Sequence, residues 1–332
     1  MHLTLENPLD MHLHLREREM LALVAPCSAA QFAGGVIMPN LVQPVDSLER
    51  LRAYRAAILD ACAGEPFTPY MTLFFRSYHR EELLAARDEI IGLKLYPAGI
   101  TTQSESGVRD FDRIGDTVAL LEDLDIPLLV HGETDGFVME REREFLRVYQ
   151  WLAETFPRLR LVMEHITTAE AVELLDRYDN VGATVTLHHL LITLDDVVGG
   201  LLQPDLFCKP IAKTPRDREA LRQAVLAGHP RLMFGSDSAP HPRHKKECCG
   251  CAAGVFSAPV LLPALAQLFE EADCLERLAD FVSHHARRFY RLRPPHKQVH
   301  LVRAPWTVME QYETLRPFLA GQTLRWRVEK RP

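Results

Sequence analysis

The sequence contains no hydrophobic run long enough to cross a membrane. Its apolar stretches, such as residues 21–25 and 260–266, are short or interrupted, whereas a membrane-spanning helix needs about 20 apolar residues. The first six residues have neither the basic nor the apolar segment of a secretory signal peptide. We therefore expect no membrane partner and no export.

An excess of basic charge is also missing. The chain has 38 Lys and Arg residues against 45 Asp and Glu residues, a net charge of −7, so its overall field does not attract nucleic acid or anionic lipid. The seven cysteines are an odd number in a chain of 332 residues, which is long enough to build a core without disulfides. We expect free thiols, no nucleic-acid partner and a cytoplasmic location.

Glycine-rich phosphate loops are absent as well, since no Gly-x-Gly-x-x-Gly or Gly-x-x-x-x-Gly-Lys pattern opens a helix-like segment. This absence makes an open, doubly wound sheet the second choice of fold. Apolar residues make up 47% and charged residues 25% of the chain, close to the averages of globular proteins. A disordered or low-complexity chain is therefore excluded.

Strand-like and helix-like segments alternate along the chain. Strands are expected at residues 9–15, 35–39, 70–75, 90–95, 127–131, 159–165, 181–187 and 231–237, and helices at 45–62, 112–124, 140–155, 168–178 and 215–227. Continuous apolar runs, as at 127–130, are typical of strands buried on both faces of a parallel sheet. We therefore predict an α/β protein with a TIM-type (β/α)8 barrel, one domain over residues 1–332. Residues 293–332, with an alternating pattern at 323–328, are expected to be a C-terminal extension with a strand, packed on the barrel.

The first predicted strand has an unusual polar face. In the strictly alternating segment 10–16, the side chains of Asp10, His12, His14 and Arg16 share one face. The apolar residues between them, which face the helices, are Met11, Leu13 and Leu15. Barrel interiors usually hold branched apolar residues, so two imidazoles two positions apart indicate a metal ion that both can reach. An edge strand with a solvated polar face is the alternative.

Four other apolar runs end at or near a residue of unusual chemistry, namely Lys94, His131, His165 and Asp237. Taken alone, such a histidine is more often a hydrogen-bonded core or rim residue, and such an aspartate is often a helix cap. In a barrel, however, the C-terminal ends of the strands meet at one mouth, where active sites lie. Four histidines and an aspartate there can bind one or two divalent ions, and imidazole with carboxylate favours zinc or a neighbouring metal.

Lys94 needs a separate explanation, because an ammonium group in an apolar strand is costly. Burial lowers the pKa of a lysine, and the neutral amine that results is a nucleophile. With carbon dioxide it can form a carbamate, which turns a cation into a carboxylate able to bridge two metal ions. A lysine that extends along the strand to reach solvent is the alternative.

Several separated motifs share an order and spacing with a known family. The motifs are residues 10–16, Met-Pro-Asn at 38–40, Lys-Leu-Tyr-Pro-Ala at 94–98, Thr-Thr at 101–102, His-Gly-Glu at 131–133, Glu-His-Ile-Thr-Thr at 164–168 and Gly-Ser-Asp-Ser-Ala-Pro-His at 235–241. Together they resemble the shorter, single-enzyme bacterial class of dihydroorotase in the amidohydrolase superfamily. The resemblance runs from about residue 7 to residue 328.

The resemblance implies a binuclear site with two divalent ions, most often Zn²⁺. In this family pattern His12, His14 and Asp237 hold one ion, His131 and His165 hold the other, and carboxylated Lys94 bridges them together with a hydroxide. The implied reaction is the reversible cyclisation of N-carbamoyl-L-aspartate to L-dihydroorotate in pyrimidine biosynthesis. Asp237 is the implied catalytic residue, which takes a proton from the hydroxide and delivers it to the departing ring nitrogen.

The resemblance also implies the substrate contacts. Arg16, Asn40 and His241 are expected to bind the substrate carboxylate, because a planar guanidinium can offer two parallel hydrogen bonds. Thr101 and Thr102 would touch the substrate from a mobile lid over residues 98–107.

A further contact implied by the family is a small residue whose backbone meets the substrate ring. Ala252 is the expected counterpart, although the spacing within residues 247–254 is shifted by one and Ala253 could take its place. The family also suggests a homodimer. His188 and His189 follow the seventh predicted strand; the resemblance places one of them near the site, and neither is assigned to a metal.

Other functions remain as alternatives. Another cyclic amidohydrolase, such as a hydantoinase or allantoinase, would keep the metal residues and change the substrate-binding set. A catalytically silent barrel that acts as a scaffold is a second alternative, although all six expected metal positions are filled. Cys248, Cys249 and Cys251 suggest a zinc knuckle, but no second pair at zinc-finger spacing supports it, so reduced thiols are expected.

Overall fold

The computed structural model describes residues 1–62 and 64–329. Eight parallel strands pair in chain order, each with the next: β2 (Leu9–Leu13), β3 (Gly34–Ile37), β4 (Thr68–Phe74), β5 (Gly92–Leu95), β6 (Leu128–Val130), β7 (Leu161–Met163), β8 (Val181–Val185) and β9 (Leu232–Phe234). The two ends of the sheet meet just beyond β9, where Leu13 forms a parallel bridge with Ser238 and the Asp237 amide donates to the His12 carbonyl at 2.8 Å. The predicted TIM-type barrel is confirmed.

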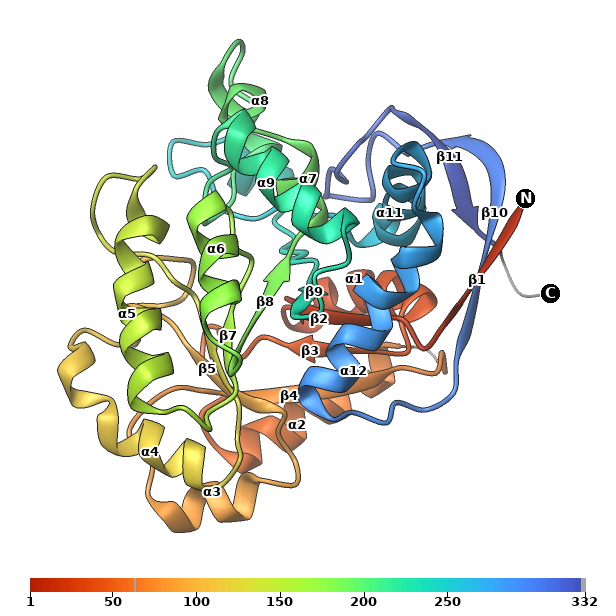
Figure 1. Ribbon diagram of the computed structural model, residues 1–332. Coiled ribbons are helices and arrows are strands. Elements are labelled where there is room, and N and C mark those ends of the chain that lie inside the picture. The colour runs from red at the N-terminus through yellow and green to blue at the C-terminus, as the bar shows by residue number, and fades with distance from the viewer. Residues whose placement is uncertain (63, 330–332) are drawn as a thin grey trace.

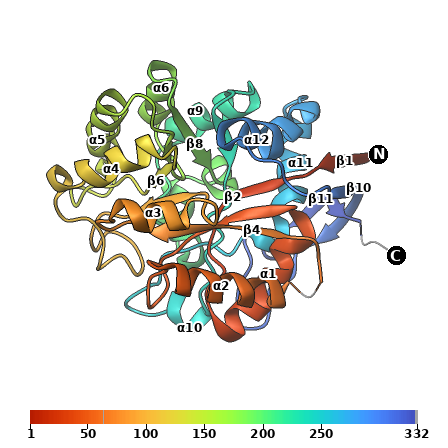
Figure 2. The same ribbon diagram turned by 90° about the horizontal axis from the view of Figure 1, so that it is seen from below.

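Helices surround this barrel (Figures 1 and 2). Those that follow strands β2 to β8 are α1 (Arg18–Gln31), α2 (Leu48–Ala61), α3 (Arg80–Ala86), α4 (Gly115–Asp123), α5 (Arg141–Thr155), α6 (Ala169–Arg177), α7 (Leu187–Leu191), α8 (Leu194–Val198) and α9 (Pro215–Leu226). After β9 come the short α10 (Arg243–Lys246), then α11 (Leu261–Glu271) and α12 (His285–Tyr290), the last preceded by a π-helical turn at Asp280–His284. The five helices predicted from the sequence all form, and each agrees within three residues at either end.

The predicted strands are correct in number and order, but several extend too far toward their C-terminal ends. The segments predicted at 159–165 and 231–237 are strands only over Leu161–Met163 and Leu232–Phe234. The chain leaves the extended conformation there because His165 and Asp237 have φ values of 40° and 43°, in the left-handed region. Most of the predicted ligands therefore lie on the loops that follow the strands.

The barrel has an inner and an outer apolar layer. Leu9, Met11, Leu129 and Val162 belong to the inner cluster, which fills the barrel, whereas Leu13 belongs to the outer cluster between strands and helices. The prediction that Met11, Leu13 and Leu15 share one face is therefore wrong for Met11. The physical reason is an irregularity in the pairing of β2 with β3 between Asp10 and Leu13, which changes the alternation.

A small sheet beside the barrel contains the predicted C-terminal extension. β1 (His2–Glu6), β10 (Gln298–Thr307) and β11 (Thr323–Val328) form an antiparallel sheet in the order β1-β10-β11. This sheet lies next to α11 (Figure 1), where the backbone amide of Arg325 donates to Gln267 at 3.0 Å. The strand predicted at 323–328 is confirmed.

In the described part of the chain, no helix combines the length and the apolar composition that crossing a bilayer requires.

Candidate active site

The six predicted metal ligands gather at the mouth of the barrel. His12 and Lys94 lie in β2 and β5, and the others, which follow the C-terminal ends of β2, β6, β7 and β9, are His14, His131, His165 and Asp237. Five of the six line one small cavity. Lys94 lies deeper in the barrel and is fully buried.

The first ligand group is His12, His14 and Asp237, which lie where β2 meets the segment after β9. The His14 Nε2 and His12 Nε2 atoms lie 3.0 Å and 3.4 Å from Asp237 Oδ1. Two ligands of one tetrahedral zinc ion, each about 2.0–2.2 Å from it, are about 3.3–3.5 Å apart, so these distances fit a shared ion. Burial lowers the pKa of His12 and lowers that of His14 further, and neutral imidazole is the form that metals bind.

The second ligand group is a pair of histidines. The His131 Nδ1 atom lies 3.1 Å from His165 Nε2, which again fits two ligands of one ion. The other ring nitrogen of His131, Nε2, is 2.8 Å from a Glu133 carboxylate oxygen. A carboxylate partner of this kind fixes which nitrogen of the ring faces a metal.

Lys94 occupies an inward-facing position of β5, because its neighbours Leu93 and Leu95 belong to the outer cluster. Its Nζ atom has no hydrogen-bond partner in the described residues and lies 5.1 Å from the centre of the Tyr96 ring. Burial lowers the pKa of Lys94 to about 8, although the nearby carboxylates act in the opposite direction. A buried amine without a partner fits a carbamate better than it fits a free ammonium group.

Glu164 supports both the first ligand group and Lys94. Its carboxylate contacts His12 Nδ1 and accepts a hydrogen bond from Thr184 Oγ1 at 2.9 Å. Burial acts to raise the pKa of Glu164, but the charges of Lys94 and His12 outweigh burial and lower it. Glu164 is therefore a carboxylate that orients the His12 ring and leaves Nε2 free for a metal.

The backbone holds His165 and Asp237 in a conformation that non-glycine residues seldom adopt. The His165 amide, at φ 40°, donates to Thr184 Oγ1 at 2.7 Å, and the Asp237 amide, at φ 43°, donates to the His12 carbonyl at 2.8 Å. Neighbouring strands thus fix both turns. Each turn directs one ligand into the mouth.

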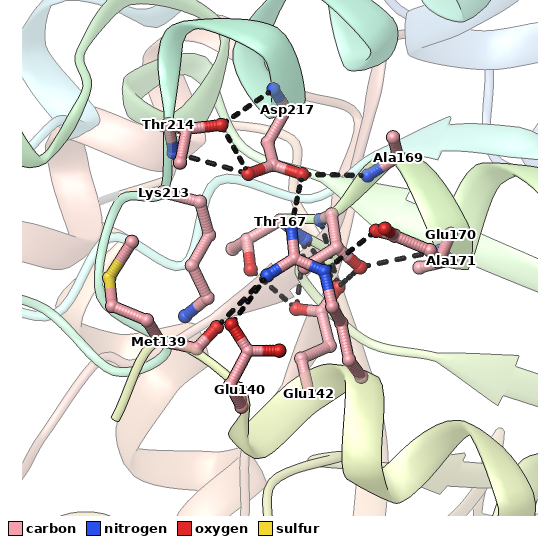
Figure 3. Close-up of polar contacts among 12 residues, drawn as sticks. Met139, Glu140, Glu142, Thr167, Ala169, Glu170, Ala171, Lys213, Thr214 and Asp217 are labelled. Carbon is pink, nitrogen blue, oxygen red and sulfur yellow. Dashed lines mark hydrogen bonds and ion pairs between the residues drawn. The ribbon is translucent and has the colours of Figure 1, made fainter. Parts of the chain in front are cut away.

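A buried carboxylate on α5 holds the turn that carries His165 (Figure 3). Glu142 accepts hydrogen bonds from the backbone amides of Thr167 and Thr168, each at 2.9 Å, and from their hydroxyls, each at 2.6 Å. Next to it, Asp217 on α9 accepts from the Ala169 amide at 3.1 Å. Two outer helices therefore fix the start of α6, immediately after a predicted metal ligand.

We expect Glu142→Gln to weaken binding of the second ion by roughly tenfold to a hundredfold, the usual effect of losing an outer support of a ligand. Glutamine has an NH2 group in place of one carboxylate oxygen, so a donor would face the amide and hydroxyl donors of Thr167 and Thr168. Competition with a chelator measures the affinity. The half-buried neighbour Glu140, whose carboxylate pairs with Arg143 instead of the turn after His165, is the matched control when changed to Gln. Unchanged affinity in Glu142→Gln would contradict the positioning role.

Of the predicted carboxylate-binding residues, Arg16 and Asn40 line the cavity, and His241 lies behind Arg16 rather than at the cavity wall. Arg16 Nη2 is 3.0 Å from His241 Nε2, and Asn40 donates to the Thr102 carbonyl at 2.9 Å while accepting from Tyr96 at 2.9 Å. Burial and the charge of Arg16 lower the pKa of His241 to about 3. His241 is therefore a neutral hydrogen-bonding group, and Arg16 is the cation available to an anionic ligand.

The resemblance implied that Ala252 is the small residue at the cavity wall, but another residue occupies that position. Ala253 and Gly254 line the cavity, and Ala252 does not. The Ala252 amide donates to the Lys245 carbonyl at 2.8 Å, and its own carbonyl accepts from Lys246 at 2.8 Å. These bonds direct Ala252 toward α10, so the structure favours the alternative, Ala253.

The segment predicted as a lid, residues 98–107, covers the cavity. Thr101 and Thr102 both line it, and the remaining volume open to a water-sized sphere is about 20 Å³, room for about one water molecule. Lys209, which also lines the cavity, donates to the Ile100 carbonyl at 2.7 Å. A larger ligand can therefore enter only if this segment moves.

Sequence reasoning missed several residues of this site, among them Tyr96, Lys209 and Glu142. Tyr96 lies two positions after Lys94, just beyond the end of β5, and this spacing could have identified it. Lys209 follows an irregular segment, and Glu142 lies on an outer helix, so no pattern connects either of them to the mouth. The cysteines Cys248, Cys249 and Cys251 are free thiols and belong to no metal-binding group in the described residues.

Comparisons with known proteins give a consistent result, although no model of a protein family matches the chain. The dihydroorotase of Helicobacter hepaticus is 43% identical over 337 residues, which cover 99% of this chain and 98% of that protein. The crystal structure of dihydroorotase from Campylobacter jejuni shares 51% identity with a TM-score of 0.95, covering 99% and 98% of the two chains. Dihydroorotase from Saccharomyces cerevisiae, solved with 5-fluoroorotic acid, shares 32% identity with a TM-score of 0.92 over the full length of both chains. The chain therefore belongs to the dihydroorotase family of cyclic amide hydrolases.

Proposed function

We propose that the mouth of the barrel binds two divalent ions, most simply Zn²⁺, and catalyses the reversible cyclisation of N-carbamoyl-L-aspartate to L-dihydroorotate. The observation that carries the proposal is the unpartnered, buried amine of Lys94, whose charge acts on His12, His14 and His165 of two ligand groups. The internal distances of these groups fit one ion each. The relatives of 43% and 51% identity support the substrate class. Their names favour dihydroorotase over the hydantoinase, allantoinase and scaffold alternatives.

In this proposal Lys94 is carboxylated and provides a bridging ligand. The ammonium group first loses a proton, and the neutral amine then attacks carbon dioxide, forms an N–C bond and loses a second proton, so that a cation becomes a carbamate anion. Together with the Asp237 carboxylate, this negative charge would offset part of the charge of two divalent ions, which the four neutral histidines cannot do. Such ions, when bound, lower the pKa of water to about 7 and polarise a carbonyl oxygen.

The chain itself supplies the proton carrier. Asp237 lies at the cavity wall with Oδ1 directed toward His12 and His14. In the hydrolytic direction its carboxylate takes a proton from the attacking water and delivers it to the ring nitrogen that departs. In the biosynthetic direction the same carboxylate removes a proton from the carbamoyl nitrogen and delivers it to the departing carboxylate oxygen, which takes a second proton from solvent and leaves as water.

Substrate recognition follows from charge. The ring form and the open form both carry a carboxylate, and Arg16 and Asn40 offer a cation and a hydrogen-bonding amide at the cavity wall, with His241 in contact with Arg16. Thr101, Thr102 and Ala253 close the cavity around the ligand. Closure excludes bulk water, which strengthens these interactions.

Two measurements test the proposal. Turnover of dihydroorotate, hydantoin and allantoin by the purified enzyme should show a clear preference for dihydroorotate, and preference for either other substrate would overturn the substrate assignment. Incubation with ¹³C-labelled bicarbonate should give a carbamate carbon signal in the NMR spectrum. The absence of this signal from metal-loaded, active enzyme would exclude a carboxylated Lys94.

We expect Arg16→Lys to raise KM by roughly tenfold to a hundredfold, because lysine cannot offer two parallel donors to a carboxylate. The metal content should stay at the wild-type value, since Arg16 contacts His241 and Pro240 rather than a ligand. Steady-state kinetics and metal analysis check this result. Arg18→Lys, at an exposed neighbour, is the control, and equal loss of substrate and metal binding would contradict the role of Arg16.

The cellular setting of the enzyme is also part of the proposal. All seven cysteines are free thiols, which supports a reducing, cytoplasmic location. The family resemblance supports a homodimer, and sedimentation of the purified enzyme tests that state directly.

A further inference from the structure

A second group of metal-binding side chains lies outside the cavity of the active site. His188, His189 and Cys208 each place a ligand atom within 4.8 Å of the others, and all three residues are buried. The two histidines belong to α7, directly after β8, and the cysteine belongs to the segment before α9. None of the three is among the residues that line the active-site cavity.

The distances among Cys208, His189 and the Pro210 carbonyl match tetrahedral coordination, and the ligand atom of His188 lies within 4.8 Å of those of Cys208 and His189. The Cys208 Sγ atom lies 3.5 Å from His189 Nε2, and the Pro210 carbonyl oxygen lies 3.1 Å from that nitrogen and 3.3 Å from the sulfur. A zinc ion with Zn–S of about 2.3 Å and Zn–N of about 2.0–2.1 Å separates its sulfur and nitrogen ligands by about 3.5 Å. Two side-chain donors and one backbone oxygen thus form one face of a tetrahedron.

His188 supplies an independent indication of a ligand. It is 0% exposed, and neither of its ring nitrogens has a hydrogen-bond partner in the described residues. Its ring centre lies 4.4 Å from that of His189, and the edge of Phe318 covers it from another side. Buried polar groups in native proteins are nearly always satisfied, so an unpartnered imidazole beside a thiol and a second imidazole indicates a missing partner.

We propose that His188, His189 and Cys208 bind a third metal ion of the zinc class, with the Pro210 carbonyl as a fourth donor. A soft thiolate together with imidazole selects zinc-like ions over magnesium or calcium. The two ligand groups of the active site consist of nitrogen and oxygen only. Sulfur therefore distinguishes the two kinds of site.

Binding requires the loss of one proton and the movement of another. Burial raises the pKa of the Cys208 thiol to about 12, and the positive ion favours the thiolate, whose proton leaves to solvent. His189 must offer Nε2 to the ion, so its ring proton lies on Nδ1. Thr186 Oγ1, 2.9 Å from Nδ1, can accept that proton in a hydrogen bond.

Such an ion would join two segments that shape the active site. Lys209 lies between Cys208 and Pro210, and its ammonium group holds the Ile100 carbonyl of the covering segment at 2.7 Å. Fixing both neighbours of Lys209 fixes the backbone from which this side chain extends. The ion is thus a structural one, which acts on the lid through Lys209.

The test uses the sulfur ligand, which the active site does not offer. A background variant in which Cys248, Cys249 and Cys251 are serine removes the accessible surface thiols. In zinc-loaded protein with this background we expect about three ions per chain and a Zn–S shell near 2.3 Å in the X-ray absorption spectrum. Adding Cys208→Ser should leave about two ions and remove the sulfur shell, while the buried control Cys62→Ser should leave both unchanged.

A second variant keeps the test decisive if Cys208→Ser does not fold. His188→Phe retains the thiol, fills the same space and should also lose the third ion, with circular dichroism as the check of folding. A Zn–S shell that persists without Cys208, or a folded background protein that holds two ions and no sulfur shell, would overturn the proposal. Because the readouts are the sulfur shell and the loss of one ion relative to the background, these results do not depend on the reaction proposed above or on the number of ions in the active site.

Discussion

Replacing Lys94 with alanine is expected to lower kcat by at least about a thousandfold, equivalent to roughly 4 kcal/mol of transition-state stabilisation. The variant removes the amine that would form the bridging carbamate, so we also expect the loss of at least one ion per chain. Lys94 is fully buried and faces into the barrel. Its removal therefore changes the charge between the two ligand groups rather than a surface contact.

Rescue by a small acid distinguishes this role from a structural one. If the missing group is a carboxylate, acetate or propionate added to Lys94→Ala should restore part of the activity together with the lost ion, because either acid fits the vacated space. Chloride at the same concentration is the control. Full activity of the untreated variant, or rescue by an amine instead of an acid, would show that Lys94 does not act as a bridge.

Asp237→Asn is expected to lower kcat by roughly a thousandfold, within the range for a lost general acid and base. The amide keeps the size of the side chain but cannot carry the proton to the ring nitrogen. KM should change little, because Arg16 and its partners bind the substrate carboxylate independently. Steady-state kinetics in both directions of the reaction measure the effect.

A neighbouring buried carboxyl group provides the control for Asp237. Asp10 accepts hydrogen bonds from the backbone amides of Ser236 at 2.8 Å and His12 at 3.2 Å, and an asparagine oxygen can accept the same two bonds. Asp10→Asn is therefore expected to keep activity within about tenfold of wild type. A similar loss in both variants would mean that Asp237 acts through the local fold and not through proton transfer.

The sequence predicts the architecture well because hydrophobic periodicity reports burial directly. Runs such as 127–130 identify parallel strands, and the order of eight strands and the intervening helices follows from their alternation. The ends of the strands are predicted less well, since His165 and Asp237 leave the extended region at φ values that no residue pattern announces. The division into a single domain with an extension at 293–332 stays a prediction.

The candidate metal ligands could be identified from the sequence, whereas most of the residues that surround them could not. His12, His14, Lys94, His131, His165 and Asp237 stand out because polar groups interrupt apolar strands, and the structure brings all six together. Their roles as ligands stay predictions. Ala252 and Lys209 depend on how an irregular loop folds, and Glu142 depends on which helix packs behind the mouth. Such long-range placements have no local signature in the sequence.

The closure of the barrel between β2 and the segment after β9 affects the order in which the protein folds. His12 and Asp237 come from opposite ends of the barrel sequence and meet only where β2 and the segment after β9 pair. Contacts of such large separation form late and slowly. A nascent chain on the ribosome therefore cannot bring His12, His14 and Asp237 together until residues beyond β9 have emerged, so closure of the barrel must precede assembly of this ligand group.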